Sequence, residues 1–461
     1  MADVAVRLVT RAERGLANTK VRAALRNATG ILSLSRSLAL DGLEDADALR
    51  DQAHAIRRHA IDALDALVDM WQANATANGI VVHHARTADE AVRIVLDLAA
   101  EHAAAGHAPV RIAKGKSMAS EEVHLNAALE AAGHEVVETD LGEFIIQLAG
   151  ESPSHLIAPA IHKSRFDVAE LFTADAGRPI APEIEAEAAY ARVRLRQAFL
   201  DADIGITGVN FAIAETGSIC LVENEGNGRM CTSLPRTHVA IMGMERIVET
   251  WDELDVMLAL LARSATGQAL SVYTNIISGP RRPTEIDGPD SVHVVVLDNG
   301  RSAVVGTQFD DALLCIRCGA CLNVCPVYRN IGGHAYGTVY SGPIGAVLTP
   351  LLRPDDPLAR ELPEASSLCG ACTEVCPVRI PLHDLLLRER HRDARADATR
   401  TRRVAFAVWS LLWSYPFTYR AGVAVAQVGL RVAARVPKLG RRTPGWVGAW
   451  GRDRALPEVR R

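Results

Sequence analysis

The sequence has few aromatic residues and no strong excess of either charge. Aromatic residues make up 5% of its 461 residues, whereas 49% are hydrophobic and 23% are charged. This profile is typical of an ordinary folded globular protein and argues against a largely disordered chain. The formal net charge of -5 gives the molecule as a whole no electrostatic attraction for nucleic acid or for an anionic membrane. Any basic surface must therefore be local.

Long uninterrupted apolar stretches are also missing. The first twenty residues mix Arg, Glu and Lys with apolar residues, and they lack the apolar core and cleavage site of a signal peptide. Near the other end, the charge-free stretch 404–419 has 16 residues and contains Pro416, whereas a spanning helix needs about 20 apolar residues. We therefore expect a cytoplasmic protein without a transmembrane segment.

Cysteine is scarce, and its nine copies are unevenly distributed. An odd number does not suit a disulfide framework, and seven of the nine lie between Cys315 and Cys376, at spacings typical of metal ligands. This distribution predicts a reducing compartment and a metal site. Cys220 and Cys231 lie outside this region in apolar segments, where a free cysteine behaves as a small hydrophobic residue, so we expect both in the core.

The first cysteine group has the spacing found in bacterial ferredoxins. Two-residue gaps let three sulfurs converge on one cluster, and the longer third gap directs the fourth cysteine to the other cluster. A following proline fixes the direction in which the chain leaves the site. The group consists of Cys315, Cys318, Cys321, Cys325 and Pro326.

The second group repeats this pattern with Ser366 in place of the first cysteine. Its cysteines are Cys369, Cys372 and Cys376, followed by Pro377. Under the same cross-over rule, the predicted ligands of cluster one are Cys315, Cys318, Cys321 and Cys376, and those of cluster two are Cys325, Cys369 and Cys372. Cluster two then has only three thiolates. A [3Fe-4S] cluster, or a four-iron cluster completed by Ser366, another side chain or solvent, would each satisfy this count.

Two other roles for the cysteines have to be weighed. Structural zinc uses closed four-ligand sites built from pairs of cysteine knuckles, which fits neither the three-cysteine spacing nor seven ligands. Clusters that merely brace the fold are the second alternative, although paired clusters suit electron transfer better. Arg317, between Cys315 and Cys318, is either a cation that raises the potential of cluster one or a solvated surface arginine.

Hydrophobic periodicity divides the chain into four parts. Residues 1–75 are predicted to be helical, because apolar residues recur three and four positions apart between charges. Residues 76–300 alternate short apolar runs with amphipathic helices, which is typical of βαβ units and a mostly parallel sheet. Residues 301–392 hold the cysteines. Residues 393–461 form a basic, Trp-bearing helical tail, with ten Arg or Lys but only two acidic residues after position 403.

This tail permits two interpretations. Trp409 and Trp413 lie one helical turn apart, and a basic helix with such residues can lie on the inner face of a membrane. Peripheral membrane contact would bring the clusters near a quinone. Alternatively, the apolar side of the helix packs in the interior of the protein.

Polar residues near the expected strand ends are candidates for a ligand pocket. The segment 113–118 leads from a strand into a helix, where backbone N–H groups can meet an anion, and the carboxyl ends of parallel strands are the usual binding edge. The same residues also fit helix caps or solvated loops, so we assign no catalytic residue. The candidates are Lys114, Lys116, His162, Lys163, Glu215 and Glu223.

Several longer motifs accompany these residues between about positions 75 and 390. They are KGKSMASEEVHLN, ETDLGEFIIQL, PSHLIAPAIHK, GITGVNFAIAETGS and NEGNGRM, together with the cysteine runs CIRCGACLNVCPVYR and SSLCGACTEVCPVRIPL. In this combination the chain resembles the lactate utilization protein B family, which also has three cysteines in its second group. The resemblance implies an α/β fold, in which an LUD domain of the NagB/RpiA/CoA-transferase-like type is followed by an α-helical ferredoxin-like domain with two [4Fe-4S] clusters.

The resemblance also implies a function. It is that of an iron–sulfur electron-transfer subunit in a multi-protein system that oxidises L-lactate to pyruvate, so that lactate serves as a carbon source. The implied partners are a cysteine-rich CCG-domain protein and a second LUD protein without clusters, and no nucleic acid is expected. Two alternatives stay open. In one, the LUD domain itself acts on a carboxylate, phosphate or CoA-like ligand, and in the other the protein is a scaffold with structural clusters.

Overall fold

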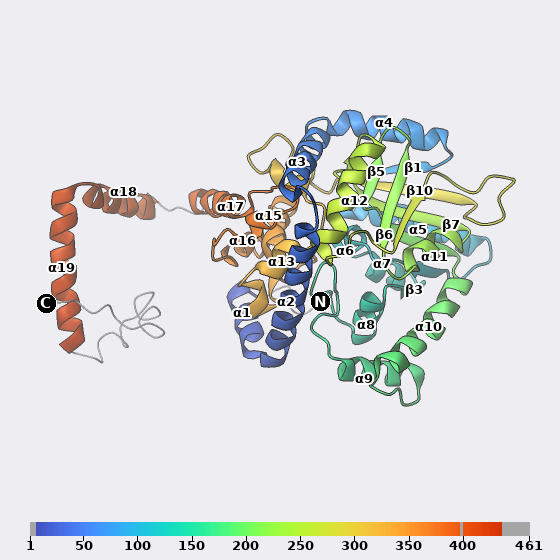
Figure 1. Cartoon of the computed structure of the whole chain (residues 1–461), viewed down its shortest axis with the longest axis horizontal. Helices are drawn as coiled ribbons and strands as arrows, with labels where there is room; N and C mark the ends of the chain where they lie inside the picture. Colours follow the sequence, from blue (N-terminus) through green and yellow to red (C-terminus); the bar gives the residue numbers. More distant parts are fainter. Residues whose placement is uncertain (1–5, 397–399, 436–461) are drawn as a thin grey trace. The chain divides into compact units, whose positions relative to one another are not determined.

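The computed structural model describes residues 6–396 and 400–435 (Figure 1). The chain forms two compact units, Met1–Arg390 and His391–Arg461. The domain boundaries predicted after residues 75 and 300 fall inside the first unit, where the segments pack together, so these boundaries stay predictions. Each unit is described by itself.

A six-stranded parallel sheet lies at the centre of the first unit. Its strand order is β1-β10-β7-β4-β2-β3, and every neighbouring pair is parallel. Every residue of the central strand β7 is buried, as expected for a parallel strand covered on both faces. The strands are β1 (Val81–Ala85), β2 (Arg111–Lys114), β3 (Glu135–Glu138), β4 (Ile204–Gly208), β7 (Thr237–Gly243) and β10 (Ser291–Leu297).

Alternate residues of these strands enter different apolar cores, because side chains along a strand point to opposite faces. Val239 and Ile241 of β7 pack on one face of the sheet with helices α5 and α7. Ala240 and Met242 of the same strand pack on the other face with α4 and a smaller sheet. The helices that flank the strands are α5 (Ala88–Ala104), α6 (Met118–Glu122), α7 (Leu125–Ala131), α8 (Leu141–Ala149), α9 (Arg165–Ala176), α10 (Ile184–Asp201), α11 (Asn227–Ser233) and α12 (Trp251–Ala265).

The smaller sheet has four strands in the order β8-β5-β6-β9. Its β5–β6 and β6–β9 pairs are antiparallel, and its β5–β8 pair is parallel. The strands are β5 (Phe211–Ile213), β6 (Ser218–Glu223), β8 (Ile247–Val248) and β9 (Tyr273–Ile277). The parallel main sheet with flanking helices confirms the predicted α/β class, and the second sheet adds a layer that the sequence pattern did not indicate.

Short helices follow the last strand, and the seven cysteines of this segment lie in these helices and in the loops between them. They are η1 (Asp310–Leu314), α13 (Ala320–Val324), α14 (Tyr328–Ile331), η2 (His334–Tyr336), α15 (Gly342–Leu352), η3 (Ala359–Glu364), α16 (Ala371–Glu374) and α17 (Leu382–Ala396). Their helical character agrees with the predicted ferredoxin-like region. Most of these elements share one apolar core with the N-terminal helices.

The four N-terminal helices connect the cysteine segment to the sheets. Helices α1 and α2 pack against α14, α1 also contacts η2, and α2 contacts α13, while α3 packs against η1 and α12; Figure 1 shows α2 beside α13. The contact is close, because a Cβ atom on Gly15 would lie 2.2 Å from the carbonyl oxygen of Ile331. The helices are α1 (Leu8–Ala17), α2 (Thr19–Asp41), α3 (Ala46–Asp62) and α4 (Leu64–Ala77).

The described part of the second unit contains α18 (Arg400–Ser414) and α19 (Pro416–Arg435), which pack against each other. Trp413 contacts the ring of Tyr419 edge to face, with ring centroids 5.5 Å apart. Trp409 and Trp413 remain 57% and 39% exposed, so neither is a core residue in the described chain. Within residues 6–396 and 400–435, no helix is both long and apolar enough to cross a membrane.

The substitution Trp71→Ala tests the packing between the two sheets. Trp71 is fully buried, and its indole N–H donates a 3.2 Å hydrogen bond to the carbonyl of Ser218. Removing a buried Trp costs about 3–5 kcal/mol of folding free energy, so we expect a large fall in the thermal unfolding midpoint. Met70→Ala is the control, because Met70 is 40% exposed, and it should change stability by less than about 0.5 kcal/mol. Equal effects of the two substitutions would contradict this packing.

Candidate functional site

The two cysteine loops adopt the same backbone conformation. The residue before the second cysteine position is left-handed in both loops, with φ of 61° at Arg317 and 54° at Leu368. The glycine after that position is also left-handed, with φ of 75° at Gly319 and 83° at Gly370, a conformation that glycine adopts without strain. Each glycine then begins a short helix, α13 or α16. The second loop thus keeps the geometry of the first although it lacks the first cysteine.

Four of the cysteines line one small cavity, which we call the cysteine cavity. Backbone N–H groups of Arg317 and Ile380 point at two of the sulfurs, each at 3.4 Å. Such N–H···S contacts are among the means by which a protein tunes an iron–sulfur cluster. The lining cysteines are Cys315, Cys318, Cys321 and Cys376, which are the four predicted for cluster one.

Burial makes these thiols poor acids in the protein alone. It raises the pKa of Cys318 and of Cys376 to about 12, with neighbouring cysteines adding to the effect. Converging buried thiols can become thiolates together only if a cation neutralises them, because metal binding releases the thiol protons. The four side chains therefore fit a metal cluster better than a set of free thiols.

The other three cysteines, Cys325, Cys369 and Cys372, form a second group. The thiol of Cys372 has a pKa of about 11, raised by burial and then by Cys325 and Cys369. Cys369 is exposed, unlike Cys325 and Cys372. The Ser366 hydroxyl accepts a 3.1 Å hydrogen bond from the backbone N–H of Leu368. The structure therefore groups the three predicted thiolates without indicating a fourth ligand.

Arginines of the N-terminal helices hold the loop at Cys376. Nη2 of Arg50 donates hydrogen bonds to the carbonyls of Glu374 and Cys376, at 2.5 and 3.0 Å. Nη2 of Arg36 donates to the carbonyl of Val375 at 2.8 Å. These residues are more than 320 positions away in sequence, so nothing in the local pattern indicated their role.

A larger cavity of about 410 Å³, which we call the strand-end cavity, lies where the main sheet meets the first cysteine loop. Thr207 and Gly208 at the end of β4 and Gly243 at the end of β7 line it from the sheet. Arg317 and Tyr340 line it from the cysteine segment. This is the carboxyl edge of the parallel strands, where open α/β sheets bind their ligands.

Two of the six predicted ligand-binding residues, Lys116 and Glu223, line the strand-end cavity. Glu223 also begins helix α11, because its carboxylate accepts the backbone N–H groups of Gly228 and Arg229, both at 2.7 Å. The ammonium of Lys116 is buried without a hydrogen-bond partner in the described part of the chain and lies 3.8 Å from Oε1 of Glu143. Of the six predicted residues, Lys116 is therefore the one that presents a charged group without a described hydrogen-bond partner to the cavity.

Two further predicted residues have structural partners and do not line either cavity. Lys114 is fully buried, and its ammonium bonds to Glu138 at 2.6 Å and to Glu121 at 3.0 Å. Burial alone would lower the pKa of Lys114, but these carboxylates raise it above its ordinary value. Glu215 accepts the backbone N–H of Trp251 at 2.7 Å at the start of α12.

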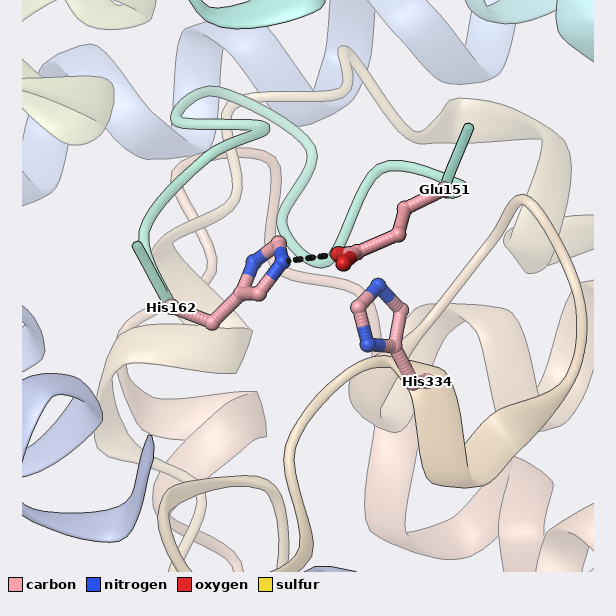
Figure 2. Close-up of side chains that lie close together, drawn as sticks. All are labelled: Glu151, His162 and His334. Atoms are coloured by element: carbon pink, nitrogen blue, oxygen red, sulfur yellow. Dashed lines mark hydrogen bonds and ion pairs between the residues drawn. The ribbon is translucent and has the colours of Figure 1, made fainter. Parts of the chain in front are cut away.

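His162 and Lys163 belong to a separate cluster, centred on Glu151 (Figure 2). Nε2 of His162 lies 2.7 Å from Oε2 of Glu151, and Lys163 forms an ion pair with the same carboxylate. Figure 2 also shows His334 beside Glu151; its Nε2 lies 2.7 Å from the carbonyl of Ser152. Glu151, His162 and His334 lie close enough to hold a metal ion, but the Lys163 ammonium already neutralises the carboxylate. The cluster joins the loop after α8 to η2.

The sequence did not indicate Glu245, or that Arg246, Arg301 and Arg317 surround it. This buried carboxylate accepts from Nε of Arg301 at 2.6 Å and from Nη2 of Arg317 at 3.2 Å, and Nε of Arg246 lies 3.9 Å away. Although burial by itself would raise it, Arg301, Arg246 and Arg317 hold the pKa of Glu245 at about 2. In the sequence, the one sign of this network was the charged pair Glu245-Arg246 inside the otherwise apolar run 239–248.

Arg317 is buried in this network, with only 8% of its surface exposed. Its guanidinium carbon lies 4.3 Å from the centroid of the Tyr340 ring. The tyrosine hydroxyl donates at 2.6 Å to Glu122, which in turn forms a bidentate pair with Arg301 at 2.7 and 2.9 Å. The interpretation of Arg317 as a solvated surface residue is therefore wrong.

Known protein families match both parts of the first unit. The LUD domain family matches residues 68–297, and the 4Fe-4S dicluster domain family matches residues 311–380. The chain is 44% identical to "Lactate utilization protein B" of Shouchella clausii and 45% identical to the protein of the same name from Geobacillus sp.. Each alignment covers 97% of this chain and 93% of the relative.

A solved DUF162 family protein from Deinococcus radiodurans also aligns with the chain. It is 15% identical, and the alignment covers 51% of this chain and 98% of the solved one. Its TM-score of 0.26 is too low to support an argument about structure.

The buried carboxyl of Glu143, which lies beside Lys116, should make the folding stability depend on pH. Burial raises the pKa of Glu143 to about 8, and Lys116 opposes the rise. Because the folded protein holds this proton more tightly than the unfolded chain, the stabilisation is complete below about pH 4.5 and is lost as the pH rises to about 8. Glu143→Gln should therefore lose less stability than the parent between pH 5 and 8 in thermal unfolding. Parallel pH profiles for the two proteins would contradict the buried neutral carboxyl.

Proposed function

The chain belongs to the lactate utilization protein B family, and from this premise we propose that it carries electrons in a multi-protein system that oxidises L-lactate to pyruvate. The observation that supports the proposal most directly is the pair of matching cysteine loops, which gather seven thiols into two adjacent groups. Such a pair suits the passage of single electrons better than a purely structural role.

We assign cluster one to Cys315, Cys318, Cys321 and Cys376, and cluster two to Cys325, Cys369 and Cys372. Bound iron–sulfur clusters accept and release one electron at a time. Cys321 and Cys372, from different groups, are close enough for the charge of Cys372 to raise the pKa of Cys321. This proximity supports exchange of electrons between the two centres.

Cluster two is the one nearer to solvent. Cys369 is exposed, and the Ser366 hydroxyl bonds to its own loop. We propose a [4Fe-4S] cluster whose last iron takes an exchangeable ligand, or its [3Fe-4S] form. The exposed edge would be the side from which a partner protein approaches.

The proposed partners are a cysteine-rich CCG-domain protein and a second LUD protein. Their support is the shared name of the curated relatives, which points to a lactate utilisation system. We propose that the system works in the cytoplasm. The exposure of Trp409 and Trp413 supports contact between the second unit and the inner face of the membrane, as in interfacial helices.

Cysteine substitutions test the cluster assignment. After anaerobic purification, Cys318→Ser and Cys372→Ser should each lower iron and acid-labile sulfide by about one cluster's content, because each removes a ligand of a different cluster. Cys220→Ala is the matched control, since Cys220 is buried in the core and should leave both contents unchanged. Colourless parent protein, or iron content indifferent to both Ser substitutions, would refute the assignment.

Electron paramagnetic resonance then tests the carrier function. We expect the parent protein to show signals of reduced clusters with dithionite, and with lactate only when the two partner proteins are present. Reduction by lactate in the isolated chain would favour the enzyme alternative. Clusters that cannot be reduced reversibly would favour the scaffold.

Arg50 tests how the protein tunes cluster one. Its guanidinium lies at the carbonyl of Cys376, where positive charge stabilises the more negative reduced cluster. Arg50→Gln should therefore lower the midpoint potential by tens of millivolts, since about 59 mV corresponds to a tenfold change for one electron. Arg50→Lys keeps the charge and should stay closer to the parent in a redox titration. An unchanged midpoint potential in Arg50→Gln would show that Arg50 does not tune cluster one.

A further inference from the structure

We propose that the strand-end cavity binds a small monocarboxylate, with the carboxylate held by Arg317 and Arg246. The class we infer is the 2-hydroxy or 2-oxo acids, a choice that rests on the proposed function. The proposal would give this chain a substrate-binding site beside its first cysteine loop.

Arg317 lies at the strand-end cavity and has donors without partners among the described residues. Its side chain lines the strand-end cavity but not the cysteine cavity. Nη2 bonds to Glu245, whereas Nε and Nη1 are buried without a hydrogen-bond partner among the described residues. Buried polar groups are nearly always hydrogen-bonded, and a guanidinium presents its donors in a planar fork that matches a carboxylate. A ligand carboxylate in the cavity would form a fork with one of these two groups and with the second hydrogen of Nη2.

The charge balance around Glu245 also favours an anionic ligand at this end of the cavity. Arg246, Arg301 and Arg317 meet two carboxylates, Glu122 and Glu245. Arg301 is satisfied by both carboxylates, which leaves Arg246 and Arg317 to share one oxygen of Glu245. One positive charge is therefore in excess among these five side chains. At this end of the cavity the excess charge matches a ligand carboxylate, because unpaired buried charge is costly.

The remaining wall suits the rest of such a molecule. Lys116 adds an ammonium donor, which is buried without a hydrogen-bond partner among the described residues and can meet the 2-hydroxyl or 2-oxo oxygen. Met118, Ile157 and Val209 supply apolar contacts for the carbon chain. A mostly apolar wall with a few converging polar groups is the usual composition of a small-molecule site.

The two arginines lie close to the cysteines of the first loop. Arg317 lies between Cys315 and Cys318 in the loop, and Nη1 of Arg246 donates to the carbonyl of Cys315 at 3.2 Å. Leu156 lines both cavities. A ligand on these arginines would therefore lie beside the first cysteine loop. Its binding should alter the electron paramagnetic resonance signal of cluster one.

Isothermal titration calorimetry on the anaerobically purified full chain tests the proposal. The probes are L-lactate, D-lactate, pyruvate and inorganic phosphate. We expect one site for at least one of the three acids, and at least about tenfold weaker binding of phosphate. Arg317→Lys should weaken binding of the acid by about tenfold or more, because Lys cannot form the bidentate contact.

Arg379→Lys is the matched control. Arg379 follows a cysteine in the second loop and also has a left-handed backbone, with φ of 54°. It pairs with Asp47 and Asp51 and lines neither cavity. This control should bind the acid within about twofold of the parent. If Arg317→Lys purifies with less iron than the parent, Arg246→Lys takes its place with the same expected loss.

Three results would each overturn the proposal. They are no binding of any of the three acids at millimolar concentration, tighter binding of phosphate than of any acid, and an arginine variant that binds the acid with unchanged affinity. Redox titration of the same preparation separates this proposal from the proposed function. Clusters that reduce reversibly in a chain that binds no acid would overturn the cavity site alone. Acid binding in a chain whose clusters do not reduce reversibly would instead overturn the carrier function.

Discussion

The buried carboxylate of Glu245 imposes the constraint on which the rest of the site depends. A carboxylate removed from water must be neutralised and hydrogen-bonded, or it costs several kcal/mol. Its partners come from different parts of the chain, with Arg246 beside it, Arg301 after the last strand and Arg317 in the first cysteine loop. Neutralising one charge therefore fixes the cysteine loop against the carboxyl edge of the parallel sheet.

A second buried charge reinforces this junction from the N-terminal helices. The guanidinium of Arg57 donates to the carbonyls of Glu245, Ile247, Leu313 and Leu314, which belong to the sheet region and to η1. A guanidinium has five N–H donors and no acceptor, so it can hold several backbone segments at once. This explains why the helices, the sheets and the cysteine segment form one compact unit. A rigid surrounding of this kind suits a redox centre whose potential depends on fixed charges and hydrogen bonds.

The first cysteine loop is consequently a shared wall between two cavities. On one side its sulfurs converge on the cysteine cavity, and on the other Arg317 lines the strand-end cavity. The left-handed residue at position 317 and the glycine at 319 let adjacent residues face these opposite sides. Chemistry at the sheet edge and electron transfer at the cysteines would therefore be adjacent in space, although the two regions are separate in sequence.

The local sequence determined the features that depend on residues close together along the chain. Ferredoxin spacing indicated the cysteine grouping, because loops of two and three residues can reach only a few arrangements, and alternating apolar runs indicated the α/β class. The motifs also carried the family resemblance. Tertiary structure decided what depends on distant partners. It placed His162 and Lys163 with Glu151 instead of in the cavity, buried Lys114 between two carboxylates, and assembled the arginines around Glu245. Such pairings follow from neutralising buried charge across segments far apart in sequence, and no local spacing records which segments will meet.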